Sequence, residues 1–410
     1  VFHRYFPARF IGSLRGQGRE VAIEVSRLYE LMGRIYFYSQ ETLPIMYSIL
    51  RLVNTAERAG PSPELASAYA GLAILAGFAQ LHSLAEIYVN RALAVAENVN
   101  QPSNLIAVGV VTSVYKMTVG KWDEIRARAE EAREICEQLG DYRQWGDSMD
   151  VLGESALISG DIQYAMNTLN ALLEDARQRR NPLQVGWGLF GVAAIHIRLG
   201  KDATAIPMLE EALQILAELP NLASLINTYG QLALANLHLG REEEALIYAN
   251  KVIDLAGNIS PTVYSMDIGF SAVAEVYFEL WEKALHDPTQ KADSERFRLL
   301  AEKAIKLLRA FQKVFPIGQP YAHYYEGWYE ELTGRPQLAV KSWQKGLEAA
   351  QKFKLLYEEG LTRVRLGSSL HGDPIACKEH FERAIQIFEK MGAVHELWFV
   401  NKARAGEARF

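Results

Sequence analysis

The sequence predicts an all-α fold in which pairs of helices repeat about every forty residues. One observation is a set of equally spaced glycines, each after a helical run and before a polar turn, at Gly120, Gly160, Gly200 and Gly240. A second is that a small or apolar residue follows each glycine at a fixed distance. A third is that no window shows the sustained alternation of apolar and polar residues that indicates a half-buried strand. Because one helix pair cannot bury its apolar face alone, stacked pairs that share a continuous core are the expected architecture.

The small residues define the register of the repeat. The first position recurs at Ile45, Ala85, Ile125, Ala165, Ala205 and Ala245, and after a slip at Phe297, Ala339 and Cys377. The second position recurs at Leu52, Ala92, Ala132, Leu172, Ala212, Val252, Ala304, Gly346 and Ala384. The two positions lie on one face of a helix, and small side chains on that face let a neighbouring helix approach closely.

Helix ends can also be placed from the sequence. Each repeat has room for two helices of roughly sixteen residues, about 24 Å long at 1.5 Å per residue. The glycine is expected to end the first helix, because a C-terminal cap often needs a left-handed backbone. Helix starts are indicated where a capping residue precedes proline, at Gln101, Asn181, Ser260 and Asp373.

Three parts are expected along the chain. Residues 1–20 are predicted to be a linker from an upstream domain, residues 21–392 the helical array, and residues 393–410 a C-terminal capping helix and tail. A polar stretch at about 281–295 interrupts the register and is predicted to be an insertion. Since the chain begins without Met and has no signal peptide, we expect it to be a piece of a longer protein.

Composition excludes several classes of function. The net charge is −6 and the isoelectric point is near 5.9, so no nucleic-acid partner is expected. Only Cys136 and Cys377 occur, which gives no disulfide framework and favours a reducing, cytoplasmic compartment. The uncharged stretch Leu65–Ala85 is long enough to span a bilayer. However, Gln80 falls where the repeat requires a turn, so no membrane span is predicted.

No motif for catalysis, a cofactor or a metal is found. The segment at Gly200 lacks the glycine spacing and the hydroxyl of a phosphate-binding loop. "GSSLHG", which begins at Gly367, is no nucleophile elbow. "VHEL", which begins at Val394, is interpreted as a helix start, because one His and one Glu cannot complete a coordination shell. The sequence therefore predicts a non-enzymatic chain with no cofactor and no metal.

The pattern resembles the tetratricopeptide repeat (TPR), whose unit is a helix–turn–helix. Three residues fit the glycine of the first TPR helix, Gly33, Gly153 and Gly327, while Ala73, Ser113, Ala193 and Ala233 replace it elsewhere. The period near forty is longer than that of TPR units and is similar to the variants in MalT-like regulators. The resemblance covers about Val21 to Arg404 and implies a right-handed α-α superhelix of about nine TPR-like helix pairs.

Some stretches show a narrower resemblance. "SAVAEVYFELWEKA" and "FPIGQPYAHYYEGWYEELTGRPQLAVKSW" are similar to the C-terminal helical region of bacterial AAA/STAND-type signalling ATPases, which are linked to class III adenylate/guanylate cyclase or Ser/Thr kinase domains. This resemblance implies a regulatory, sensing region of a multidomain signalling protein.

The TPR resemblance also implies a groove lined by the first helix of each pair. The groove positions carried over are Asp147, Asp150, Glu154, Trp187, Phe190, Tyr321, Tyr324 and Trp328, with Arg27, Glu30 and Arg34 in the first repeat. An acidic patch beside aromatic anchors favours a basic peptide. The leading hypothesis is therefore a protein or peptide partner in the groove, which could be the protein's own upstream ATPase or effector domain.

Other interpretations stay open at this point. The aromatic stripe with Tyr321, Tyr324 and Trp328 has the spacing of an inter-repeat core. A small-molecule inducer could bind in an apolar groove that uses Trp187 and Phe190. A homo-oligomer could form through the last helix, which carries Trp398 and Phe399, or these residues could form an inward-facing cap.

Overall fold

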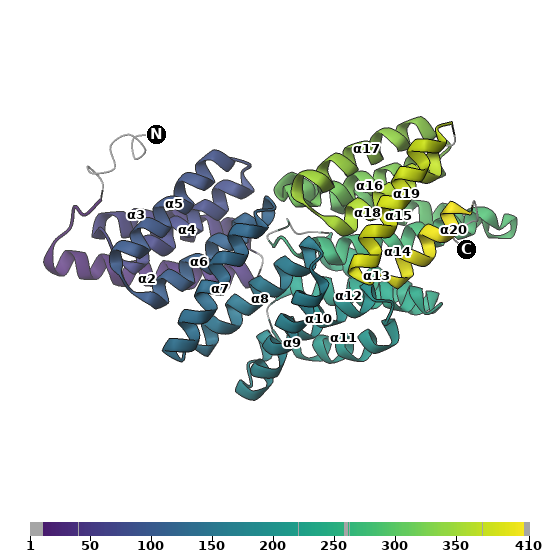
Figure 1. Ribbon diagram of the computed structural model, residues 1–410. Helices are drawn as coiled ribbons and strands as arrows, with labels where there is room; N and C mark the ends of the chain where they lie inside the picture. The colour runs from purple at the N-terminus through teal and green to yellow at the C-terminus, as the bar shows by residue number, and fades with distance from the viewer. Residues whose placement is uncertain are drawn as a thin grey trace. The chain divides into compact units, whose positions relative to one another are not determined.

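The structure is a computed structural model that describes residues 11–39, 41–219, 221–257, 261, 263–370 and 372–405. It confirms the predicted all-α array, since these residues form consecutive helices and contain no strand (Figure 1). The first helices are α2 (Gly16–Tyr38), α3 (Thr42–Ala59), α4 (Pro63–Phe78), α5 (His82–Val99), α6 (Pro102–Thr118), α7 (Trp122–Leu139), α8 (Tyr142–Ser159), α9 (Ile162–Arg179), α10 (Pro182–Arg198) and α11 (Asp202–Leu216). They are followed by α12 (Leu222–His238), α13 (Glu242–Ala256), α14 (Met266–His286), α15 (Lys291–Val314), α16 (Gln319–Leu332), α17 (Pro336–Phe353), α18 (Leu356–Ser369), α19 (Pro374–Met391) and α20 (Val394–Arg404).

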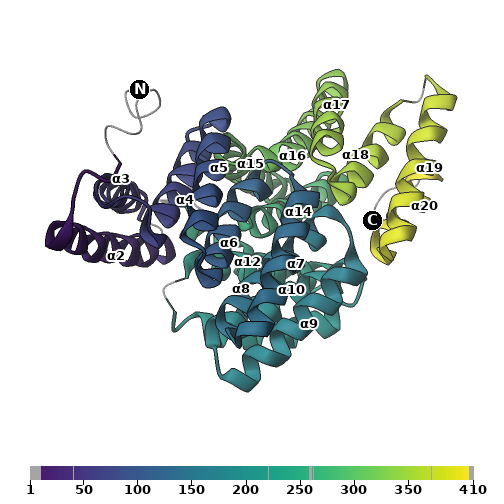
Figure 2. The ribbon, with the colours of Figure 1, turned by 60° about the vertical axis from the view of Figure 1, so that its left-hand side comes forward.

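The chain divides into two compact units. One comprises Val1–Leu152 with Pro220–Leu222, and the other comprises Gly153–Leu219 with Ala223–Phe410. Within the second unit consecutive helices pack as antiparallel neighbours, for example α16 with α17 and α18 with α19 (Figure 1 and Figure 2). The candidate site lies entirely within this second unit.

The repeated glycines end the first helix of their pairs, as predicted. Their φ angles are positive, +70° at Gly120, +93° at Gly160, +67° at Gly200 and +74° at Gly240. Gln80 occupies the same register position and adopts φ +58° without the freedom of a glycine. Left-handed backbone is disfavoured for residues with a Cβ, which explains why glycine recurs there.

The small residues of the register are buried between helices. Ala85, Ala165, Ala205 and Ala245 have no exposed surface, and the same holds for Ala92 and Ala212 at the second position. This confirms the predicted close approach of helices at these two positions.

The helices of the second unit form an inner and an outer layer. The first helices α10, α12 and α14 are buried around most of their circumference. In contrast, the second helix α13 buries only the stripe Ala245, Ala249, Val252 and Ala256. First helices therefore supply the side chains that face the interior of the unit.

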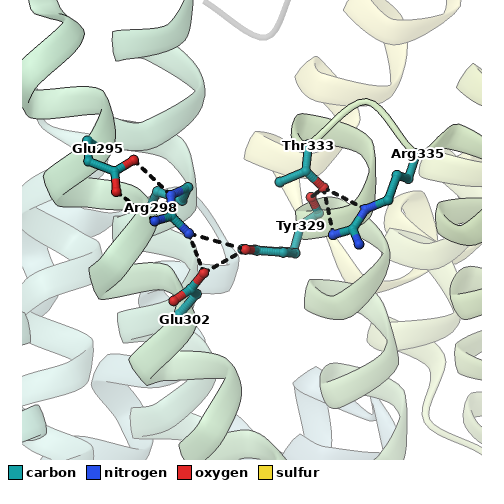
Figure 3. Close-up of polar contacts among 6 residues, drawn as sticks. All are labelled: Glu295, Arg298, Glu302, Tyr329, Thr333 and Arg335. Atoms are coloured by element: carbon teal, nitrogen blue, oxygen red, sulfur yellow. Dashed lines mark hydrogen bonds and ion pairs between the residues drawn. The ribbon is translucent and has the colours of Figure 1, made fainter.

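The polar stretch at about 281–295 is helical for most of its length. It contains the end of α14, the 3-10 turn Pro288–Gln290 and the start of α15. Arg298 of α15 binds Glu295 and Glu302 of its own helix, and Tyr329 of α16 donates a hydrogen bond to Glu302 at 2.6 Å (Figure 3). At the C-terminal end of α16, Thr333 and Arg335 continue this polar network. The stretch thus extends α14 and α15, and Arg298 and Glu302 just beyond it clamp α15 to Tyr329 of α16.

The C-terminal helices of the second unit pack back on its first helices. A Cβ added at Gly160, just after α8, would lie 3.2 Å from Leu356 Cβ of α18. A Cβ at Gly392, just before α20, would lie 3.2 Å from Leu199 Cδ2, next to the end of α10. The second unit is therefore closed upon itself by α18 and α20.

The uncharged stretch Leu65–Ala85 is divided between α4, a turn and the start of α5. In the part of the chain that the structure describes, no helix combines the length and the apolar composition that crossing a membrane requires.

Candidate functional site

A pocket of about 80 Å³ lies inside the second unit and is called the inner pocket below. Its walls come from α8, α10, α12, α14, α16 and α18, all first helices of their pairs, and from α20. Its polar lining residues are Arg198, Gln231, His238, Ser271, Glu275, Tyr321, Tyr325, Tyr357, His395 and Glu396. The inner pocket is therefore a site with both polar and apolar walls, assembled by the closure of the unit.

Arg198 supplies a cation in the last turn of α10. Its Nη1 donates a hydrogen bond to the carbonyl oxygen of Leu157 at 2.7 Å, and its guanidinium lies 4.5 Å from the centre of the Tyr357 ring. Burial lowers the pKa of Arg198, but the nearby Tyr321 and the Glu358 carboxyl outweigh it, so the pKa is raised. Arg198 stays charged and is held by a carbonyl and an aromatic face.

Two carboxyl groups lie close to Arg198. Tyr357 donates a hydrogen bond to Glu396 Oε1 at 2.5 Å, and Tyr321 interacts in the same way with Glu358. Burial raises the pKa of both Glu358 and Glu396, and the positive charge of Arg198 offsets part of this effect. The second oxygen of each, Oε2, is buried without a hydrogen-bond partner among the described residues.

A histidine pair forms one edge of the inner pocket. His238 Nδ1 lies 2.8 Å from Asp202 Oδ1, and its ring stacks on that of His395 with the centroids 4.3 Å apart. Burial lowers the pKa of His238. The hydrogen bond to Asp202 and the charge of Asp202 raise it by more than burial lowers it, so the net pKa is raised. The contact with Asp202 joins α12 to α11, and the contact with His395 joins α12 to α20.

Gln231 of α12 is the least satisfied side chain of the site. Only 2% of its surface is exposed, and in the described structure neither Nε2 nor Oε1 has a hydrogen-bond partner. A buried polar group left without a partner costs about 1–3 kcal/mol. Gln231 therefore offers one donor and one acceptor to a molecule that enters the pocket.

Further carboxyl groups surround this centre. The Tyr325 hydroxyl lies 2.8 Å from Glu275 Oε2, and Tyr264 donates a hydrogen bond to Glu154. Burial raises the pKa of Glu154 to about 7, although the bond from Tyr264 acts in the opposite direction. Burial also raises the pKa of Asp267 well above its usual range. The surroundings of the pocket thus contain more acidic than basic groups.

The lining of the inner pocket can bind a ligand through hydrogen bonds and charge. The one hydroxyl-bearing aliphatic residue among its lining is Ser271, whose Oγ donates to the carbonyl oxygen of Ile268 at 3.2 Å. The lining residues therefore bring together hydrogen-bonding and charged groups, without a serine or cysteine hydrogen-bonded to a base.

The acidic residues predicted for the groove all lie on α8 and differ in burial. Asp147 and Asp150 are half-buried on the part of α8 that belongs to the first unit. Glu154 belongs to the second unit, is buried, and pairs with Tyr264. Whether any of the three contacts a partner stays a prediction.

The aromatic residues predicted for the groove differ in burial. Tyr321 lines the inner pocket. Tyr324 and Trp328 are only 2% and 0% exposed, and Arg365 lies 3.8 Å from the centre of the Trp328 ring. The structure thus places Tyr324 and Trp328 in the core between repeats, outside the lining of the inner pocket.

Trp187 and Phe190 lie on α10 and are not among the residues that line the inner pocket. Phe190 belongs to the hydrophobic core of α9 to α12, and Trp187 packs against the same core. Whether these two residues help to bind a small-molecule inducer stays a prediction.

The two aromatic residues of the last helix, predicted either to form an oligomer contact or an inward-facing cap, differ in exposure. Phe399 is buried and lines the inner pocket, whereas Trp398 is 48% exposed and stacks on His395. α20 therefore acts as an inward-facing cap through Phe399, and the homo-oligomer stays a prediction.

Several site residues were missed by the sequence analysis, namely Arg198, Gln231, His238, Tyr357 and Glu396. One signal was available, because Arg198 and His238 occupy the same register position in successive repeats, just before the Leu-Gly that ends the helix. No such signal exists for Glu396, whose "VHEL" segment does start a helix but also lines the pocket.

Comparison with known proteins places the fold among TPR-type repeat arrays. A tetratricopeptide repeat family model matches residues 185–258, which include most of α10 and all of α11 to α13. No curated protein matches the chain.

Two solved structures resemble the whole array. A Rap protein complexed with Competence and Sporulation Factor shares 11% identity and a TM-score of 0.56, with 95% of this chain and 100% of that chain covered. A monomeric IFIT1 mutant with Gppp-AAAA shares 14% identity and a TM-score of 0.50, with 93% and 83% covered. At such identities the likeness shows the fold, which is that of a TPR-type helical array.

Proposed function

We propose that this chain is a non-catalytic regulatory region that binds a protein or peptide segment at the inner pocket of its second unit. The observation that carries the proposal is Gln231, a buried amide with no partner among the described residues, which lines a pocket walled by seven helices. TPR-type arrays are typical of protein-interaction scaffolds, and first helices commonly supply their binding surface.

The similar Rap structure supports the proposal. That protein is complexed with Competence and Sporulation Factor, so an array of this fold holds a ligand. A bound segment would act by favouring one arrangement of the closed second unit over another, since a ligand shifts an equilibrium only through its differential affinity. The two arrangements would differ in the contacts that α20 makes with α10 and α12.

The wider role proposed is that of a sensor in a multidomain bacterial signalling protein of the cytoplasm. It rests on the resemblance of the quoted stretches to AAA/STAND-type ATPases. The upstream ATPase or effector domain would then receive the effect of the bound segment. The inner pocket itself is too small for a drug-sized inducer, because pockets for such ligands measure roughly 300–1,000 Å³, whereas the inner pocket measures about 80 Å³.

The experiment that tests the proposal is a selection of random peptides against the full chain, followed by affinity measurements on variants. Gln231→Leu should weaken a selected peptide at least about tenfold, the effect of losing one buried polar partner. Gln214→Leu, at an exposed position of the outer helix α11, is the matched control and should leave the affinity unchanged. Selected peptides that bind both variants as tightly as the natural chain would contradict the proposed site.

A further inference from the structure

Among the lining atoms without a hydrogen-bond partner in the described structure are two buried acceptor oxygens and the amide donor Gln231 Nε2. Glu396 Oε2 and Gln231 Oε1 are both buried, and neither has a hydrogen-bond partner within the described ranges. Glu396 is 5% exposed, so water outside the protein hardly reaches its carboxyl group. A ligand with N–H donors would satisfy both oxygens.

The charge around the pocket is unbalanced. Carboxyl groups are contributed by Glu275 and Glu396 in the lining and by Glu358 and Asp267 beside it. The cation among them, Arg198, makes no ion pair within 4.0 Å among the described residues and binds a carbonyl and an aromatic ring instead. His238 is paired with Asp202 and leaves no excess positive charge.

The raised pKa values of these carboxyl groups agree with a shortage of positive charge near them. Burial raises the pKa of Glu358, Glu396 and Asp267, and for Asp267 the charge of Glu358 raises it further. An additional cation close to them would favour their ionised forms.

The aromatic walls are of a kind that accepts cations. Tyr321, Tyr325 and Tyr357 line the pocket, and Arg198 already lies over the ring of Tyr357. A cation over an aromatic face is attracted by the negative face of the ring, more strongly when it is desolvated. The faces of Tyr321 and Tyr325 are stacked, with centroids 6.4 Å apart, and provide a wall beside the carboxyl groups.

We propose that the inner pocket receives the cationic end of a basic side chain, an alkylammonium or guanidinium group, from the bound segment. This inference rests on the proposed function, and it gives the chemistry by which that segment is anchored. Glu396 and Gln231 would accept its hydrogen bonds, and the tyrosine faces would cover its aliphatic stem.

The size of the pocket agrees with a single end group. A cavity of about 150 Å³ holds a benzene molecule, and the inner pocket, at about 80 Å³, is smaller. It therefore admits the end of one side chain, while the rest of the segment would lie outside it.

The test uses n-butylammonium chloride as the probe, with butan-1-ol and sodium butyrate as neutral and anionic analogues at equal ionic strength. Binding to the full chain is followed by NMR titration. We expect n-butylammonium to bind at least about tenfold more tightly than butan-1-ol, and butyrate to bind least, as the charge complementarity requires.

Variants locate the site and separate charge from folding. Glu396→Gln keeps the shape of the side chain and should weaken n-butylammonium about tenfold, whereas Glu389→Gln, exposed on α19, should change nothing. Gln231→Glu adds a carboxyl group to the pocket and should strengthen binding several-fold at pH about 8. Because one variant loses affinity and another gains it, a folding defect cannot explain both.

Three results with the small probes would overturn the inference. These are butyrate binding more tightly than n-butylammonium, n-butylammonium affinity that Glu396→Gln leaves unchanged, and no saturable binding of n-butylammonium. Selected peptides that depend on Gln231 but carry no basic residue would also overturn it, while leaving the proposed function intact. Saturable, Glu396-dependent binding of n-butylammonium without any selected peptide would support the pocket chemistry and contradict the proposed function.

Discussion

The imidazole rings of His238 and His395 stack with their centroids 4.3 Å apart, so that the end of α12 meets the start of α20. The same closure brings Gly392 against Leu199 and Gly160 against Leu356. It places Glu396 and Phe399 of α20 in the wall of the inner pocket. The site therefore depends on contacts between the two ends of the second unit.

His238 should make stability depend on pH. Its pKa is raised because Asp202 outweighs burial, with Glu279 and Glu396 adding to the effect and His395 facing the same ring. A raised histidine pKa gives stability that is complete below the ordinary value of 6.5 and is lost as pH rises through the raised value. His238→Gln should therefore cost about 1–3 kcal/mol near pH 6 and less near pH 8.5, measured by urea unfolding.

The control for this prediction is His286→Gln, at the exposed C-terminal end of α14. It should leave the free energy of unfolding within about 0.5 kcal/mol at both pH values. An equal cost of His238→Gln at the two pH values would show that the charge of His238 does not stabilise the closure.

Glu154 is an acid rather than a base, but its raised pKa should change stability with pH in the same direction as that of His238. Burial raises its carboxyl pKa to about 7 from an ordinary 4.5, so the folded chain holds the proton more tightly. That contribution is complete below pH 4.5 and is lost as pH rises through about 7. Relative to Glu154→Gln, the natural chain should lose up to about 3 kcal/mol of unfolding free energy between pH 5 and pH 8.

Glu174→Gln, exposed on α9, provides the matched control and should show no pH-dependent difference. A pH-independent difference for Glu154→Gln would mean that Glu154 is ionised throughout.

Two glycine substitutions test the closure of the second unit. Gly240 has φ +74° and open space around an added Cβ, so Gly240→Ala should cost about 1–2 kcal/mol from backbone strain alone. Gly160 has φ +93° and an added Cβ would also crowd Leu356 at 3.2 Å, so Gly160→Ala should cost more. Urea unfolding measures both, and an equal cost would contradict the packing of α18 against the end of α8.

Loss of the hydrogen bond that clamps α15 to α16 should lower the free energy of unfolding by a smaller amount. Tyr329→Phe removes the hydroxyl that donates to Glu302 at 2.6 Å and lies 3.4 Å from Arg298 Nη1 (Figure 3). The free energy of unfolding should fall by about 1 kcal/mol. Tyr142→Phe, at an exposed position of α8, should have no measurable effect, and a similar loss in both would argue against the clamp.

The fold was predictable because its determinants are local and periodic. The φ angles at Gly120 and Gly240 and the burial of Ala165 and Ala205 follow from the needs of each turn and each helix contact. The polar stretch before Phe297 was harder to interpret, since its few apolar residues left the extension of α14 and α15 unmarked.

The candidate site was predictable only in part. Tyr321 was one of the groove positions carried over from the TPR resemblance, and it lines the inner pocket. Trp328 was predicted in the same way but is buried in the core. Glu396 could not be found, because it reaches the pocket only through the return of α20 to α10 and α12. Long-range closure leaves no periodic trace in the sequence.

The most direct test of the central claim is hydrogen–deuterium exchange of the full chain with and without a selected peptide. The account predicts slower exchange on binding in the helices around the inner pocket, above all α10, α12, α18 and α20, while the outer helix α13 stays unchanged. Protection confined to outer helices or to residues before Leu152 would contradict it, because the bound segment would then lie elsewhere.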